Sequence, residues 1–162
     1  MPKLKVSSYL KLVFFISSLA VILAFFVQYI LGHQPCNLCL IERIPYILSL
    51  IILLINLRLK KIDKYLILFL FVIFLFSLVI SIYHLGIEIG LIQESMICDL
   101  KNSANILSKE QLLEELQKKT ISCKDVTFRV FGFSLTTINM IISLILVILS
   151  FKIFISYEKN KQ

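Results

Sequence analysis

Two cysteines stand two residues apart, Cys36 and Cys39, where one long apolar segment ends and the next begins. Arg43 follows Cys39 inside the second segment. Residues four apart share a face of a helix, so a fixed positive charge is expected one turn below the second thiol. A helix N-terminus and a nearby cation both favour the thiolate, which is the reactive form of cysteine. The spacing therefore predicts a redox-active dithiol at the edge of a bilayer.

The elements that must position this pair are long apolar runs. The chain has 162 residues, of which 59% are hydrophobic, and its mean hydropathy is +0.93. A soluble domain is about 45–50% apolar, whereas a helix of about 20 apolar residues crosses the hydrocarbon core. We therefore expect one all-α membrane domain over residues 1–162, a four-transmembrane-helix bundle. Its spans are predicted at about 10–31, 41–57, 65–83 and 130–155, with redox loops at 32–40 and 84–129.

The distribution of basic residues predicts the orientation of the spans. Four spans place both tails and the 58–64 loop on one face, and this face carries more lysine and arginine than the long loop of the other face. The basic residues of the first face are Lys3, Lys5, Lys11, Arg58, Lys60, Lys61, Lys64, Lys152, Lys159 and Lys161. The first face is therefore predicted to be cytoplasmic. Because topology explains the net charge of +7, no nucleic-acid partner is expected.

All four cysteines then face the outer side of the membrane. Thiols are kept oxidised on that side. Four cysteines allow three pairings. Proximity in the sequence favours the disulfides Cys36–Cys39 and Cys98–Cys123. Two outward dithiols suggest a relay by thiol–disulfide exchange.

The long loop contains one readable helix. The segment beginning at Ser108 fits a capping box, with Leu107 and Leu112 spaced as a hydrophobic staple. Its leucines share one face, so a short amphipathic helix along the membrane interface is expected. A plain solvated loop helix is the alternative.

A membrane-edge dithiol must pass two electrons on, and a lipid-soluble quinone is the natural acceptor beside a bilayer. Arg43 would stabilise the charge that develops on the ring oxygens of the quinone. Alternatively, Arg43 is an anchor at the membrane interface or a partner of Glu42. His84, at the outer end of the third span, reaches a similar depth and either lines the same pocket or has no catalytic part. Leu40 follows Cys39, so no haem-attachment motif is present.

These motifs resemble the disulfide bond formation protein B (DsbB) family. The resemblance rests on the Pro35-Cys36-Asn37-Leu38-Cys39 segment with Glu42-Arg43, on His84-Leu85-Gly86-Ile87-Glu88, on the pair Cys98 and Cys123, and on Phe131-Gly132-Phe133-Ser134-Leu135. It covers nearly the whole chain, in order and spacing. The composition of the loop between Cys98 and Cys123 differs from that of familiar members, which leaves the choice of partner open.

The resemblance implies a protein dithiol:quinone oxidoreductase of the bacterial inner membrane. Such a protein reoxidises a periplasmic thioredoxin-fold thiol oxidase (DsbA-like), with ubiquinone or menaquinone as electron acceptor. By matching position, Cys98 would form the mixed disulfide with that partner and Cys123 would be its intramolecular mate. Cys36 would exchange with the loop pair, and Cys39 would face the quinone. Arg43 would contact the quinone, with His84 nearby.

Three alternatives stay open from the sequence. A vitamin K epoxide reductase-like protein usually carries its Cys-x-x-Cys on a late span, whereas this pair follows the first. A zinc protein with four thiolates would need a second close cysteine pair, which the distant Cys98 and Cys123 do not supply. We therefore expect no metal. A non-catalytic subunit with structural disulfides is the third alternative.

Overall fold

The computed structural model describes residues 2–59, 64–93, 98, 123–124, 129–130 and 132–159. Within these ranges the chain forms four long helices, α1 (Pro2–Tyr29), α2 (Asn37–Leu59), α3 (Lys64–Glu88) and α5 (Leu135–Lys159). Each is long and apolar enough to cross a membrane. The predicted all-α, multi-pass membrane fold is therefore confirmed. The amphipathic helix expected near Ser108 lies outside the described residues.

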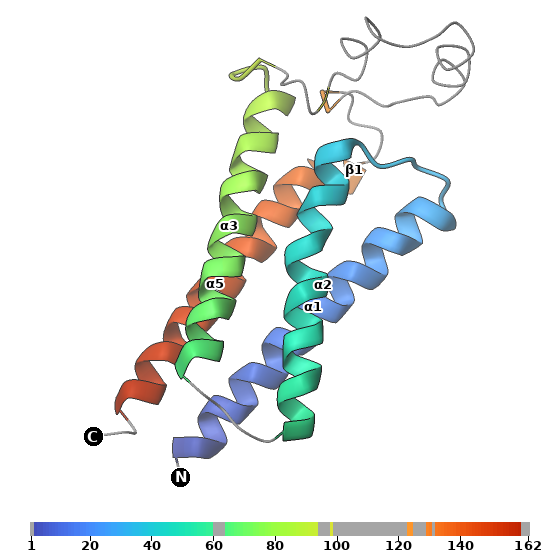
Figure 1. The fold of residues 1–162 in the computed structure, drawn as a ribbon. Coiled ribbons are helices and arrows are strands. Elements are labelled where there is room, and N and C mark those ends of the chain that lie inside the picture. The colour runs from blue at the N-terminus through green and yellow to red at the C-terminus, as the bar shows by residue number, and fades with distance from the viewer. Residues whose placement is uncertain are drawn as a thin grey trace, which may run out of the picture.

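The four helices form a closed bundle in which each packs against two neighbours (Figure 1). Helix α1 contacts α2 and α5, and α3 contacts the same two helices from the other side. Both ends of the chain lie at one end of the bundle, and the end of α1 and the start of α2 lie at the other (Figure 1). This arrangement places the Cys36–Cys39 segment at the end of the bundle opposite the termini.

The bundle is apolar outside and rich in small polar residues inside. Large side chains such as Phe15, Phe76 and Val79 are exposed on the helix surfaces, as expected for helices that face lipid. Small residues let helix backbones approach closely in a membrane, and hydroxyls can bond across the interface. Among the described residues, the serines with 0–1% of their surface exposed are Ser17, Ser49, Ser77, Ser81, Ser143 and Ser150.

Helix α2 begins at Asn37, four residues before the predicted span, because Cys36 caps it. The Cys36 carbonyl accepts the Leu40 N–H at 3.2 Å, which is the first bond of the helix. The Cys36 Sγ accepts the Cys39 N–H at 3.3 Å, the position that a capping side chain serves. Cys39 therefore lies in the first turn of α2 and not in the loop expected at 32–40.

Helix α3 also continues further than predicted, through His84 to Glu88, and ends before Gly90, whose φ of 77° favours glycine. The chain returns through a small hairpin in which β1 (Arg129–Val130) pairs antiparallel with β2 (Phe133–Ser134). Ser134 Oγ then accepts the Thr137 N–H at 3.2 Å and caps α5. The fourth helix therefore starts at Leu135, five residues after the predicted start of its span.

Candidate functional site

The two thiols of the Cys-x-x-Cys segment lie side by side at the start of α2. Their Sγ atoms are 2.8 Å apart and are not covalently joined. Cys36, with 6% of its surface exposed, is the more buried of the two. The pair is therefore held at the distance of a dithiol that can close into a disulfide.

The thiol of Cys36 is more acidic than that of an ordinary cysteine. The hydrogen bond from Cys39, together with the contact to His84, lowers the pKa of Cys36 to about 5, although burial opposes the shift. Its position as the cap of α2 acts in the same direction, because the exposed N–H groups of a helix start stabilise an anion. The Cys36 thiol therefore ionises more readily than an ordinary cysteine when the pair is reduced.

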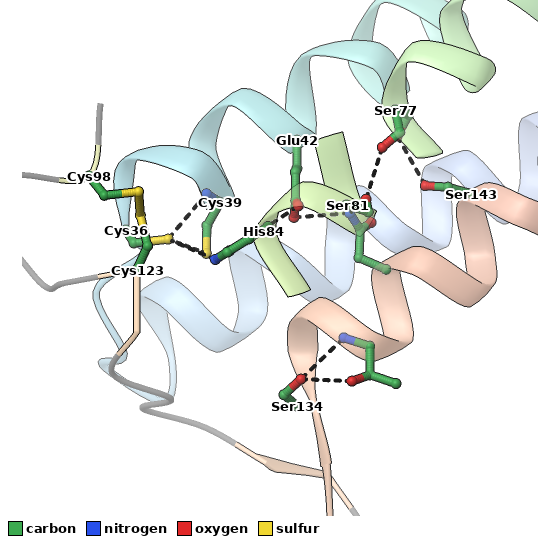
Figure 2. A network of polar contacts seen from close by, with 12 residues as sticks. Cys36, Cys39, Glu42, Ser77, Ser81, His84, Cys98, Cys123, Ser134 and Ser143 are labelled. Carbon is green, nitrogen blue, oxygen red and sulfur yellow. Dashed lines mark hydrogen bonds and ion pairs between the residues drawn. A yellow bond between two sulfur atoms is a disulfide. The ribbon is translucent and has the colours of Figure 1, made fainter. Parts of the chain in front are cut away.

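His84 reaches this pair from α3 and is 2% exposed. Its Nε2 lies 3.6 Å from the Cys36 Sγ, and its Nδ1 lies 3.1 Å from Glu42 Oε1 on α2 (Figure 2). Glu42 is itself 6% exposed, and Asn139 of α5 donates to its Oε2 at 3.0 Å. Three helices thus meet in one buried polar chain next to the thiols.

The loop cysteines lie against the same place. Cys98 and Cys123 are joined by a disulfide, with Cα atoms 5.6 Å apart. Both are buried in one apolar cluster with Cys36, Leu38 and Ile87, and Figure 2 shows the disulfide beside Cys36. The structure therefore brings all four cysteines together at one end of the bundle.

Arg43 points across to α1. Its guanidinium donates to the Gln28 side chain and, at 3.5 Å, to the Ala24 carbonyl. It also lies over the Phe25 ring, 5.3 Å from its centre, within the range of a cation–π contact. The two Glu42 oxygens contact His84 and Asn139. In the described part of the chain, Glu42 is therefore paired with these residues and not with Arg43.

A cavity of about 530 Å³ opens beside the dithiol. Its apolar walls include Ala20, Leu23, Val27, Leu31, Ile138 and Ile142. Its polar lining includes Cys36, Cys39, Glu42, Arg43, His84 and Asn139. A mostly apolar cavity of this size with a few polar groups in its lining is typical of a site for a small apolar molecule.

The sequence reasoning missed Glu42, Asn139 and Tyr46 as members of the site. Tyr46 donates to the Asn139 Oδ1 at 2.7 Å and lies 2.9 Å from the Ser143 Oγ. A carboxylate within a membrane span is costly and must be paired. Glu42 in the second span and Asn139 in the fourth could therefore have been recognised in the sequence as candidate site residues.

Three ligand atoms, from Cys36, Cys39 and His84, lie within 4.8 Å of one another and could contact a metal ion. Two thiolates about 2.3 Å from a tetrahedral zinc stand about 3.7 Å apart. The 2.8 Å between the Cys36 and Cys39 sulfurs is too short for that arrangement. The four-thiolate site does not fit either, because Cys98 and Cys123 are bonded to each other.

Comparison with known proteins agrees with this geometry. A family model described as "Disulfide bond formation protein DsbB" matches residues 7–153. The uncharacterized protein RP370 of Rickettsia prowazekii (strain Madrid E) is 30% identical over 148 residues, which cover 90% of this chain and 86% of that protein. No solved structure matches the chain significantly. The family match spans all four helices, and the chain therefore belongs to the DsbB family of disulfide bond formation proteins, which implies disulfide oxidoreductase activity.

Proposed function

We propose that the chain reoxidises a periplasmic thioredoxin-fold thiol oxidase (DsbA-like) and passes the electrons to a membrane quinone. The observation that carries this proposal is the cavity beside Cys39 and Arg43, which is apolar along most of its length and polar at the dithiol. A quinone, which is a conjugated ring dione, with an apolar tail has matching chemistry. Ubiquinone and menaquinone both fit this description.

The proposed relay begins at the loop disulfide. A reduced partner attacks Cys98, and its electrons reduce the Cys98–Cys123 bond by thiol–disulfide exchange. The loop dithiol then reduces the Cys36–Cys39 disulfide, with Cys36 as the attacked sulfur. The shared burial of Cys36, Cys98 and Cys123 supports this order, because it makes the second exchange intramolecular.

The dithiol then passes its two electrons to the quinone. In this proposal Cys39 faces the quinone from the first turn of α2, and Arg43 and His84 hold the head group. The quinone supplies the two-electron acceptor. The guanidinium, fixed by Gln28 and Phe25, supplies a positive charge near the ring oxygens on which negative charge develops.

We place this single domain in the bacterial inner membrane, with both termini in the cytoplasm and the cysteine loops in the periplasm. The termini lie at the opposite end of the bundle from the thiols (Figure 1), which supports this topology. The excess of basic residues in the tails and the short loop supports the cytoplasmic location of that end of the bundle.

The proposal is tested with the purified, detergent-solubilised chain and a reduced thioredoxin-fold dithiol as donor. Quinone absorbance is followed beside donor oxidation, with ubiquinone and with menaquinone. Loss of quinone in step with donor oxidation supports the relay. No quinone loss with a competent donor and either quinone overturns it.

Two further measurements separate the alternatives. Stoichiometric zinc in the purified protein would favour the metal site that Cys36, Cys39 and His84 could form after the sulfurs move apart. Trapping of thiols with and without respiratory quinone tests the structural-disulfide alternative. In the relay, cysteines accumulate in the reduced form without quinone, whereas structural disulfides stay oxidised.

A further inference from the structure

The electron relay leaves one feature of the site without a use, which is the buried acid–base chain behind Cys36. Closing the Cys36–Cys39 disulfide makes one S–S bond, breaks two S–H bonds and releases two protons. The two electrons go to the quinone of the proposed function, whose conversion to the quinol takes up two protons. The thiols are buried, so the protons need a defined acceptor close to the sulfur atoms.

His84 is placed to accept the proton of Cys36. Its Nε2 lies 3.6 Å from the Cys36 Sγ, and its Nδ1 lies 3.1 Å from Glu42 Oε1. A carboxylate can only accept, so Nδ1 carries the ring proton and Nε2 presents its lone pair to the thiol. The order Cys36–His84–Glu42 matches a nucleophile, a base and a group that orients the base.

Asn139 of α5 fixes the far end of this chain. Its Nδ2 donates to Glu42 Oε2 at 3.0 Å and to the Ser81 Oγ at 2.8 Å, and its Oδ1 accepts the Tyr46 hydroxyl at 2.7 Å. Two acceptors lie at the nitrogen of the amide and a donor lies at its oxygen, so Asn139 can adopt only one orientation here. That orientation presents an N–H to the carboxylate.

The hydroxyls behind Asn139 agree with this direction. Since Tyr46 donates to Asn139, it accepts from Ser143 at 2.9 Å, and Ser143 in turn accepts from Ser77 at 3.0 Å. Ser81, which accepts from Asn139, donates to the Ser77 carbonyl at 2.9 Å. The donors from Ser77 through Ser143 and Tyr46 to Asn139 therefore point toward Glu42, whereas Ser81 forms a side branch (Figure 2 shows the serines). An amide does not pass protons readily, so these residues orient Glu42 and do not conduct.

We propose that His84 takes the proton of Cys36 in the reduced pair and holds it until the Cys36–Cys39 disulfide forms, and that Asn139 is the positioning residue that holds Glu42 and His84 for this role. The Cys36 thiolate then bonds to the Cys39 sulfur as the Cys39 S–H bond breaks and the two electrons pass to the quinone. The imidazolium supplies one of the two protons that the quinol requires, and the Cys39 thiol supplies the other. This role rests on the proposed function. It makes His84 a proton acceptor for a thiol, in addition to any contact with the quinone.

The test uses a full-length variant in which Cys36 is the only cysteine, with serine at 39, 98 and 123. The rate of alkylation by iodoacetamide is measured from pH 4.5 to 9.5 without donor or quinone. Other ionisable side chains along the same cavity are His33, Arg43 and Glu88, and they are unchanged throughout. The backbone N–H of residue 39 still reaches the Cys36 Sγ in this background, so the difference between the profiles with and without His84 reports the histidine.

In this background, His84→Asn is expected to move the alkylation profile of Cys36 up by at least one pH unit, about a tenfold slower reaction at pH 6. Asn139→Leu is expected to slow the reaction at pH 6 about threefold, and to have no further effect once His84 is asparagine. Ser150→Ala is the matched control, because Ser150 is buried on the same helix and its hydroxyl has no hydrogen-bond partner among the described residues.

An unchanged profile in His84→Asn would overturn the proposal. An equal effect of Asn139→Leu with and without His84 would also overturn the positioning role, because it would then act through packing alone. The assay contains no quinone and no partner protein. Its failure therefore stays distinct from a failure of quinone reduction by the wild-type chain.

Discussion

Arg43 on the second helix, which lines the cavity, is bonded to Gln28 on the first. The guanidinium therefore has a fixed position beside the dithiol and is not free to follow the charge of the adjacent Glu42. A cation that is already in place when charge develops costs little reorganisation. Gln28 thus supports the position of the Arg43 charge in the proposed site.

Arg43→Ala is expected to lower kcat/KM for quinone by about tenfold or more, which corresponds to about 1.4 kcal/mol or more of lost transition-state stabilisation. Gln28→Leu should give a smaller loss in the same direction, because the charge stays but loses its support. Arg58→Ala, in the last turn of the same helix, is the control. Unchanged quinone kinetics in Arg43→Ala would leave Arg43 as an anchor only.

Cys39→Ser is expected to abolish multiple turnover while the loop disulfide still exchanges once with a reduced partner. The hydroxyl cannot form the Cys36–Cys39 bond, but the Cys98–Cys123 bond is made without it. A single-turnover assay with one equivalent of reduced donor, followed by thiol trapping, measures both effects. Continued turnover in Cys39→Ser would disprove the exit role of Cys39.

The reduced wild-type chain should show an unusually acidic thiol at Cys36. Since its pKa is lowered from 9.0 to about 5, Cys36 should react with iodoacetamide at a nearly constant rate from pH 9 to pH 6 and lose reactivity only as the pH falls through about 5. A free cysteine loses its thiolate below about pH 8.5. Mass spectrometry of quenched samples gives the labelled position.

The sign of the matching stability effect follows from the same shift. The folded pKa of Cys36 lies below the unfolded value, so its ionisation stabilises the reduced folded chain fully above about pH 9, and this contribution is lost as the pH falls through about 5. The oxidised chain, in which Cys36 does not titrate, should lack this dependence. An alkylation profile centred on pH 8.5 would contradict both expectations.

The sequence was sufficient for the spans and for the place of the thiols, because uninterrupted apolar length and a Cys-x-x-Cys at a segment boundary are local signals. It was not sufficient for the partners of His84. Glu42 lies 42 residues away from His84, and Asn139 lies 97 residues away from Glu42. These helices are apolar on nearly all sides, so polarity does not reveal how each is rotated in the bundle. The observed partner of His84 comes from another helix.

The helix ends show the same limit at shorter range. A thiol is not a usual capping side chain, so Cys36 was placed in a loop, although its Sγ accepts the Cys39 N–H. The cap places Cys36 at the start of the helix, where an anionic sulfur is stabilised, and places Cys39 in the first turn.

Tyr46 offers a test of the hydroxyl chain that does not touch the thiols. Tyr46→Phe leaves the Asn139 Oδ1 without its donor and frees the Ser143 hydroxyl, while the ring keeps its packing against Phe74. Hydrogen bonds between membrane helices contribute about 0.6 kcal/mol on average and at most about 1.7 kcal/mol, so the free energy of unfolding should fall by about 1 kcal/mol. Unfolding in mixed detergent micelles measures it, with Tyr29→Phe as the exposed control. If the loss persists in full when Asn139 is already leucine, the tyrosine acts through packing and not through the amide.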